Sequence, residues 1–470
     1  MNIGIAPSQV RLLVLLSLTV IVVMTGESML TAALPDIEQE FSVPGIYESL
    51  ILPIVLLVGA AASPFVGTAG DMYGHKRLLI LCLTIYLIGL FFGLFAPDLW
   101  ILLIGRGLQG AGIAAFPLAY AIIKERFPLP AADTGIGVIS AMYGAGTFIG
   151  VITGSMITGF FSWRINYFLL IPLTIILLIL IYRFIEDIPP FEEKSTLDWS
   201  GFFSLLIFLL LGLMYFSHPH DQEAGMTPLI LLVLCISALL FFIRSERRAA
   251  RPLADYRLIR KRPVAIFMVI GFLTILVFFM LLQLMPFVIR LPSGLSLTPQ
   301  MVGLILIPGT LCDMIGGPLT GRMIPIIGCR IPCVIGSVML LSAGVILFTL
   351  PLSFWVLVIG WMLFSTGMSV VATADLIGVM DYVSVERTAE ATGIIQSMQT
   401  LGGMVGPVLT GVLLSTSEVT VMQEGKELIM PETGTFYLVF GAVILVSTLL
   451  FLIAWLLMRD DRRIRSLQEP

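Results

Sequence analysis

Four ionisable residues lie inside or at the edge of long apolar stretches of this 470-residue chain: Glu27, Arg106, Asp313 and Asp375. A charged side chain at the centre of a bilayer costs about 2.5–3.5 kcal/mol on insertion scales, so such a residue is read first as functional. A buried carboxyl that changes its partner or its access to water can take up a proton on one side of a membrane and release it on the other. These residues therefore predict ion coupling.

Depth within the apolar stretches suggests which of these residues meet. Arg106 lies about seven residues, roughly 10 Å, from the outer end of its segment, and Glu27 lies roughly 12 Å below the outer surface, eight residues before Pro35. We expect the two to pair, either as a proton or cation site or as a structural salt bridge. Asp313 lies near mid-depth, far along the chain, and is a second candidate for coupling or substrate contact. Asp375 is a further candidate, near the cytoplasmic edge of its segment.

The composition excludes a soluble protein, because 58% of the residues are hydrophobic and only 12% are charged. Soluble domains are about 45–50% apolar and about 25% charged. The five cysteines have no metal-ligand spacing, and the chain lacks the motifs His-Glu-x-x-His, Gly-x-Ser-x-Gly and the phosphate-binding loop. We therefore predict no enzyme, no metal or cofactor and no nucleic-acid partner. With no soluble domain to bind ATP, transport would run on an ion gradient.

The apolar segments predict an all-α polytopic membrane protein with 14 transmembrane helices, within a range of twelve to fourteen. Each has roughly the 20 residues that a helix needs to cross a bilayer. The candidate spans are 12–34, 48–69, 78–96, 99–121, 135–158, 165–184, 200–216, 229–243, 264–289, 301–323, 332–350, 354–380, 393–415 and 435–458.

Basic residues orient these spans. With fourteen of them, all but four of the 26 Lys and Arg residues lie on the N-terminal side of the membrane. The exceptions are Arg106, Arg164, Arg290 and Lys426. Because cytoplasmic loops carry the excess of Lys and Arg, both termini are predicted to be cytoplasmic. The basic loop 244–262 serves as a topology anchor or a contact for anionic lipids.

The two ends of the chain resemble each other at a nearly constant offset. Pro64, Gly67 and Gly74 recur 254 positions later, and Gly146 and Gly150 recur 256 positions later. We predict a six-helix bundle over 1–190, a two-helix insert with its basic loop over 191–262, and a second six-helix bundle with a cytoplasmic tail over 263–470. Parallel repeats of this kind are a transporter architecture, with the substrate site at their interface.

The loop after the second span reads Gly67-Thr-Ala-Gly-Asp71-Met-Tyr-Gly74-His-Lys76-Arg77. Gly74 suits a turn that needs a positive φ. The loop resembles the signature of the major facilitator superfamily. In that family the aspartate and the basic residues latch the cytoplasmic ends of the two halves, so the resemblance implies a gating role; a loop that only sets topology is the alternative. The counterpart in the second half has Pro325 where Asp71 stands.

Two further motifs extend this resemblance to the fourteen-helix branch of drug:proton antiporters, which includes tetracycline and multidrug exporters. Arg106 and Gln109 match the fourth-helix motif of proton-driven members, and Glu27 precedes Leu34-Pro35-Asp36 as in related exporters. The fifth-helix glycine motif is matched in part, and generic helix packing is its alternative. Its residues, with their counterparts in the second half, are Gly146, Gly150, Gly154, Gly402, Gly406 and Pro407.

The function predicted from these features is that of a secondary transporter. It exports amphipathic or cationic drugs in exchange for protons, acts as a monomer in the plasma membrane, and has small molecules, protons and lipid as its partners. Export of one endogenous metabolite and proton symport are the alternatives, and a membrane enzyme or receptor is a remote one. Candidate residues of the substrate cavity are Gln109, Met142, Tyr143, Gln283, Gln396 and Gln399.

Overall fold

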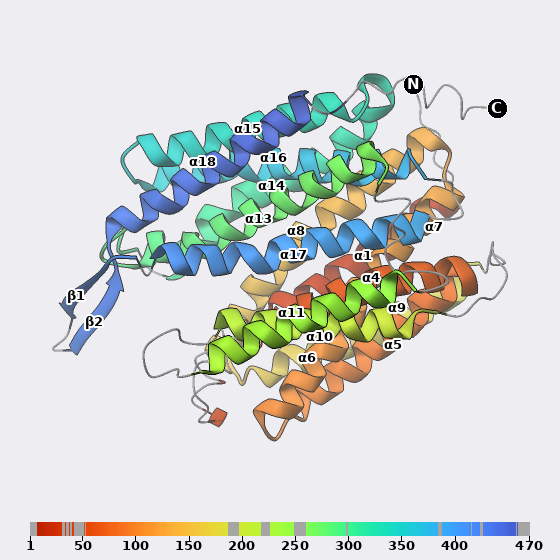
Figure 1. Cartoon of the computed structure of the whole chain (residues 1–470), viewed down its shortest axis with the longest axis horizontal. Helices are drawn as coiled ribbons and strands as arrows, with labels where there is room; N and C mark the ends of the chain where they lie inside the picture. The colour runs from red at the N-terminus through yellow and green to blue at the C-terminus, as the bar shows by residue number, and fades with distance from the viewer. Residues whose placement is uncertain are drawn as a thin grey trace. The chain divides into compact units, whose positions relative to one another are not determined.

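Long helices make up almost all of the computed structural model of the chain (Figure 1). The structure describes residues 7–30, 53–186, 197–217, 226–248, 260–297, 299–383, 388–414, 416–423 and 426–456, together with positions 33, 37, 40–41, 51 and 458. The histidines of the insert, His218 and His220, and most of the basic loop after them lie outside the described residues.

The helices that precede the predicted insert are α1 (Pro7–Ser28), α4 (Pro53–Tyr73), α5 (His75–Leu94), α6 (Leu99–Ala114), α7 (Phe116–Arg126), α8 (Leu129–Phe160) and α9 (Arg164–Phe184). The insert forms α10 (Trp199–Ser217) and α11 (Thr227–Glu246). The remaining elements are α13 (Arg262–Arg290), α14 (Pro299–Ile327), α15 (Arg330–Thr349), α16 (Phe354–Met380), α17 (Thr388–Leu414), β1 (Glu418–Gln423), β2 (Lys426–Pro431) and α18 (Thr433–Leu456).

Thirteen helices in the described part of the chain are long and apolar enough to cross a membrane, and Trp199–Tyr215 is a shorter apolar helix. A helix is favoured in lipid because it satisfies all its backbone hydrogen bonds internally. The prediction of a polytopic helical membrane protein is therefore confirmed, whereas the count of fourteen spans stays a prediction.

One predicted span is broken. The apolar stretch that begins at Leu99 extends to Arg126, but α6 ends at Ala114 and α7 starts at Phe116. Pro117 stands at the start of α7 and has no N–H to donate to the preceding turn, so an uninterrupted helix would lose a hydrogen bond there. The expectation of one helix over 99–121 did not include this break.

A two-stranded hairpin joins α17 to α18. Strands β1 and β2 are antiparallel, with Val419 opposite Met430 and Val421 opposite Leu428. In Figure 1 the ribbon of the hairpin continues beyond the ends of both helices. At its base, the Ser417 hydroxyl donates to Glu432 at 2.6 Å. This segment lies between the predicted spans 393–415 and 435–458, for which no strands were predicted.

The chain divides into two compact units. Unit 1 contains residues 1–135, 146–265 and 382–400, and unit 2 contains residues 136–145, 266–381 and 401–470. Helices α8 and α17 thus contribute to both units. The predicted boundaries at residues 190 and 262, which come from the internal repeat, remain a prediction.

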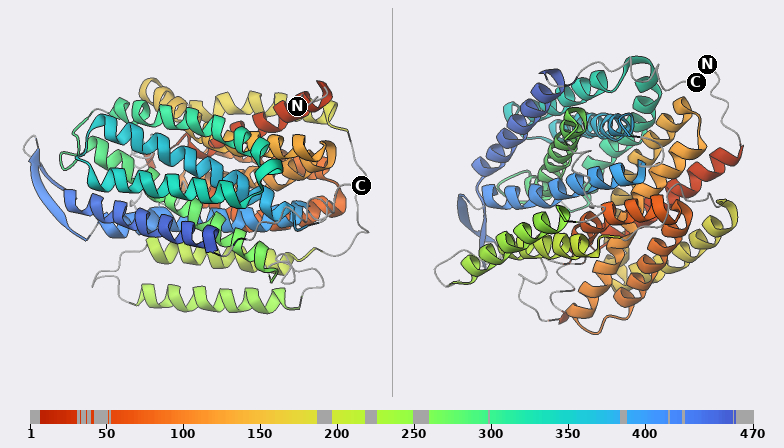
Figure 2. Two further views of the ribbon diagram at one scale, coloured as in Figure 1. Left: turned by 90° about the horizontal axis from the view of Figure 1, so that it is seen from above. Right: turned by 45° about the vertical axis from the view of Figure 1, so that its right-hand side comes forward.

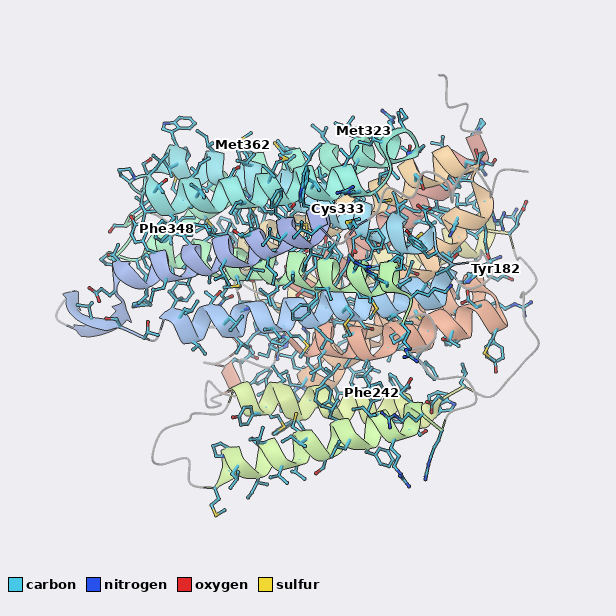
Figure 3. All side chains as sticks on the ribbon, turned by 45° about the horizontal axis from the view of Figure 1, so that its top comes forward. Tyr182, Phe242, Met323, Cys333, Phe348 and Met362 are labelled. Carbon is cyan, nitrogen blue, oxygen red and sulfur yellow. The ribbon has the colours of Figure 1, made fainter. Side chains whose placement is uncertain are left out.

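Within unit 1, the insert packs as a pair of helices. Helix α10 lies along α4, and α11 lies along α10 (Figure 2). An aromatic cluster joins α10 to α4, with ring centroids of Phe65 and Trp199 4.7 Å apart and those of Phe65 and Phe202 5.1 Å apart. Figure 3 labels Phe242 on α11, a helix whose large apolar side chains are mostly exposed, as expected of a surface that faces lipid.

The first half of α17 also packs in unit 1, against α4. The Ser397 hydroxyl donates to the carbonyl of Ala60, and a Cβ at Gly393 would lie 2.6 Å from the carbonyl oxygen of Ser63. Two backbones approach this closely only where one residue has no side chain. A glycine and a serine of α17 thus fix its distance from α4.

A glycine with positive φ lies in the turn between the second and third helices of each predicted repeat. Gly74, between α4 and α5, has φ 97°, and Gly328, between α14 and α15, has φ 76°. This region of φ is costly for a residue with a Cβ. The two glycines are 254 positions apart, the offset of the predicted repeat, which stays a prediction.

Candidate functional site

A buried polar cluster forms in unit 1 where α6 passes the end of α1. The Arg106 side chain has no exposed surface, and Glu27 is 7% exposed. Arg106 Nη1 donates to the carbonyl of Gly26 and Nη2 to the carbonyl of Glu27, both at 2.7 Å, while Nε donates to Ile51 at 3.0 Å. The two residues predicted to pair are therefore brought together, and the hydrogen bonds of Arg106 go to the main chain at Glu27.

These bonds explain how α1 ends inside the protein. The last carbonyls of a helix have no partner within it, and they carry the negative end of the helix dipole. Helix α1 ends at Ser28, so the carbonyls of Gly26 and Glu27 need donors from outside. The Arg106 guanidinium supplies two N–H groups and a positive charge there. Arg106 thus caps α1 and places a fixed charge beside Glu27.

Gln109, one turn after Arg106, belongs to the same cluster. Its Oε1 accepts from Arg106 Nη1 at 3.0 Å, and its Nε2 donates to the carbonyl of Gly89 on α5 at 3.2 Å. Gln109 has no exposed surface. It was predicted to line a substrate cavity, and the structure gives it a role in orienting Arg106.

Tyr86 and Gly26 belong to this cluster but were absent from the predicted site. The Tyr86 hydroxyl donates to the carbonyl of Val22 at 3.1 Å, and a Cβ at Gly26 would collide with that hydroxyl. Gly26 therefore permits α5 to approach the last turn of α1. Its place directly before Glu27 was the available signal in the sequence.

In unit 2, Asp313 is placed in the middle of α14 and is 7% exposed. A Cβ at Gly144 of α8 would collide with the Asp313 carboxylate, so the two residues are in direct contact. On its other flank, Ser369 of α16 donates to the main-chain carbonyl of Asp313 at 2.9 Å. Asp375, also on α16, has no exposed surface.

The signature loop differs from expectation in the basic residue that Asp71 meets. His75 Nε2 lies 2.8 Å from Asp71 Oδ1, and its Nδ1 lies 2.8 Å from Glu125 Oε1 on α7. Lys76 instead lies over the ring of Tyr182 on α9, with its Nζ 5.5 Å from the ring centroid. Tyr182 is labelled in Figure 3. The loop residue Arg77 is exposed, and Gly67 lies buried within α4.

His75 was not among the predicted residues of this loop, whose basic members were Lys76 and Arg77, because a histidine does not carry a permanent charge. Its position four residues after Asp71, on the next helix, was the only signal in the sequence. Glu125 gave none, because it comes from a helix end 50 residues further along the chain. Only the packing of α7 against α4 and α5 brings it to the ring.

Glycines of α8 form a close contact with α1. A Cβ at Gly146 would lie 2.9 Å from the carbonyl oxygen of Ile21, and one at Gly150 would lie 2.5 Å from that of Thr25. A Cβ at Gly154 would collide with the backbone of Met29. The predicted face of small residues on this helix is thus the surface where α1 approaches.

The same arrangement recurs between α17 and α13. A Cβ at Gly406 would lie 2.6 Å from the carbonyl oxygen of Leu276, and one at Gly402 would lie 3.0 Å from the backbone nitrogen of Leu276. Pro407 lies within α17. Each predicted repeat therefore packs the glycines of its fifth helix against its first.

The remaining cavity candidates are divided between the units. Gln396 and Gln399 are buried in unit 1, at 3% and 6% exposure. Met142 and Tyr143 belong to unit 2 and directly precede Gly144, the neighbour of Asp313, whereas Gln283 of unit 2 is exposed. A single cavity lined by all of them stays a prediction.

Comparisons with known proteins agree with this architecture. The chain is 25% identical over 437 residues to the multidrug resistance protein Stp of Mycobacterium tuberculosis, covering 90% of this chain and 79% of that protein. It is 26% identical over 347 residues to the efflux pump dotC of Dothistroma septosporum, covering 71% and 59%. It is 28% identical over 265 residues to multidrug resistance protein 3 of Bacillus subtilis, covering 56% and 51%.

The human organic anion transporter MFSD10 has the same fold, with a TM-score of 0.66, 17% identity and coverage of 95% of this chain and 100% of that one. The family model of the Major Facilitator Superfamily matches residues 16–373 and 289–470. This match and the fold it shares with MFSD10 indicate a transporter of small molecules and not an enzyme. The apolar helices and the buried charged residues within them agree with this conclusion. The chain belongs to the Major Facilitator Superfamily.

Proposed function

We propose that this transporter exports amphipathic or cationic compounds in exchange for protons, by alternating access. Three relatives that are 25–28% identical carry the names multidrug resistance protein or efflux pump, which supports export as the direction and drugs as the substrate class. The chain's own residues supply the argument for protons.

The observation that carries the proposal is a carboxylic acid buried beside a fixed positive charge within the membrane. Glu27 lies in the last turn of α1, and the Arg106 guanidinium contacts its main-chain oxygen at 2.7 Å. Taking a proton on or off Glu27 changes the net charge next to a guanidinium that holds the end of α1. Protonation is thereby linked to the position of a helix end, as coupling requires.

Asp313 is the candidate contact for a cationic substrate or a second coupling acid. An acid that is 7% exposed on a membrane-spanning helix is costly, and a bound cation or proton would offset that cost. The Asp313 carboxylate lies so close to Gly144 that no larger residue fits at position 144. Met142 and Tyr143 directly precede this glycine. Methionine and aromatic side chains adapt to varied apolar ligands.

The loop from Gly67 to Arg77 is proposed as the gating element, with Asp71 as its acidic member. The counterpart loop carries Pro325 at the position equivalent to Asp71, so the two repeats contribute unequally to gating. We further propose that both termini are cytoplasmic, that the membrane is the plasma membrane, and that a monomer is sufficient for transport. The excess of Lys and Arg on the N-terminal side supports this orientation.

The experiment that tests the proposal uses purified protein in liposomes with an imposed pH gradient and a panel of lipophilic cations and neutral drugs. Proton release from the lumen on addition of a substrate is expected for the wild type. Glu27→Gln should abolish gradient-driven transport while leaving substrate binding intact. The matched control is Glu186→Gln, which neutralises an exposed carboxylate that pairs with Arg126 at 3.1 Å.

Coupled transport by Glu27→Gln at the wild-type rate would exclude this residue as the proton site. Proton movement in the same direction as the substrate would identify a symporter. Silence across the panel, with binding intact, would favour a dedicated metabolite exporter or sodium coupling.

A further inference from the structure

His75, the first residue of α5, lies between two carboxylates from two other helices. One ring nitrogen is 2.8 Å from Asp71 on α4, and the other is 2.8 Å from Glu125 on α7. All three side chains are buried, with 5%, 5% and 4% of their surfaces exposed. Water therefore contributes little to stabilising the charges, and the three groups must compensate one another.

The two short contacts determine how many protons the trio holds. The Asp71 contact is a hydrogen bond, whereas the Glu125 contact has the distance of an ion pair and leaves Glu125 Oε1 without a hydrogen-bond partner. At 2.8 Å, an unprotonated Nδ1 beside an ionised carboxylate would place two lone pairs against each other, so a positively charged ring fits this position between two carboxylates. A neutral imidazole carries only one N–H, whereas an imidazolium carries two. The trio therefore holds one proton more than a neutral histidine between two carboxylates would provide.

The other charged groups near the ring do not change this count. On α5, Lys76 lies over the ring of Tyr182, and on α7, Arg126 pairs with Glu186. Among the described residues, the charged groups whose ion-pair contacts with the ring are established are Asp71 from α4 and Glu125 from α7. If the extra proton leaves, one of the two contacts becomes repulsive inside a buried site.

We propose that Asp71, His75 and Glu125 form a proton-binding site at the ends of α4, α5 and α7, on the side predicted to be cytoplasmic. The bound proton fastens these three helix ends together. A rise of pH on that side removes the proton and loosens the fastening, while acidification retains it. This site is separate from Glu27 and goes beyond the proposed exchange of substrate for protons.

The protonation of His75 can be measured directly in the full-length protein in lipid nanodiscs. The chain has three histidines, so the nitrogen NMR spectrum of protein labelled with ¹⁵N-histidine contains few signals. The signal that disappears in His75→Gln is assigned to His75. We expect both ring nitrogens of His75 to be protonated or to share a proton at neutral pH, with loss of one proton at alkaline pH. The matched control, His218→Gln with His220→Gln, should leave this titration unchanged.

The carboxylate partner provides the second arm. Glu125→Gln removes one of the two charges that retain the proton, so the His75 titration should move to lower pH by about one to three units. His75→Arg keeps a permanent charge and several donors, so its thermal stability should lack the alkaline decline that the proposal predicts for the wild type. A His75 ring that is neutral throughout pH 6–9, or a titration that Glu125→Gln leaves in place, would overturn the proposal. Neither outcome depends on transport activity or on Glu27.

Discussion

Gly150 allows α8 to lie directly against α1, and adding a single methyl group there tests how closely the helices are packed. In Gly150→Ala the new Cβ would lie 2.5 Å from the carbonyl oxygen of Thr25 and 2.9 Å from its Cα, and it would also contact the Ser28 hydroxyl. Two of these three atoms belong to the backbone of α1, which moves only if the whole helix moves.

Forcing an extra methyl group into a packed interface costs typically about 1–3 kcal/mol. An alanine is better than a glycine in a helix by about 1 kcal/mol, so the observed loss is reduced by that amount. Gly411 in α17 provides the matched control, because nothing lies within 4 Å of a Cβ placed there. Gly411→Ala should therefore leave stability unchanged or raise it by up to about 1 kcal/mol.

The assay is unfolding of the purified protein in mixed micelles with increasing SDS, followed by tryptophan fluorescence. We expect the midpoint for Gly150→Ala to fall below wild type and that for Gly411→Ala to equal or exceed it. Adding Ser28→Ala to Gly150→Ala should restore little, because the backbone contacts with Thr25 remain. If Gly150→Ala is as stable as Gly411→Ala, or if Ser28→Ala rescues it fully, the backbone contact described here does not limit the approach of the helices.

Three further substitutions test the charged residues. Arg106→Lys keeps the charge but cannot make all four hydrogen bonds of the guanidinium. Each hydrogen bond lost should lower stability by about 1.5–3 kcal/mol. An unfolding midpoint equal to that of the wild type in the same SDS titration would contradict the capping role. Asp71→Asn should slow transport turnover without weakening ligand binding, and normal turnover would mean that the loop only sets topology. Asp313→Asn should reduce the affinity for cationic substrates more than for neutral ones, measured by fluorescence binding; equal losses would assign Asp313 to coupling or folding.

Local rules of the sequence were enough for the helices and for one special turn. Stretches of about 20 apolar residues must satisfy their own backbone in lipid, so they form helices without regard to their neighbours. Gly74 was expected to have a positive φ from its place in a short reversal, and its φ is 97°. The break before Pro117 follows the same kind of local rule, so it could have been predicted from the sequence.

The partners of the buried charged groups could not be obtained in this way. Equal depth placed Glu27 and Arg106 at one level of the membrane, but depth does not say whether the guanidinium meets the carboxylate or the main chain. The choice depends on where α1 ends, since the end of a helix leaves carbonyls that need donors. Likewise Glu125 reaches His75 only because α7 begins anew after Ala115 and packs against α4 and α5.

The sequence alone thus determined that the chain crosses a membrane many times, and which ionisable residues lie within its spans. Both follow from composition and from hydrogen bonding within single segments. Tertiary structure decided which groups such residues contact: main-chain oxygens for Arg106, a glycine of α8 for Asp313, and Glu125 as the second carboxylate for His75. The physical reason is that a buried polar group must find its partner among atoms brought near by packing, and packing joins residues that are 50 to 169 positions apart in the chain.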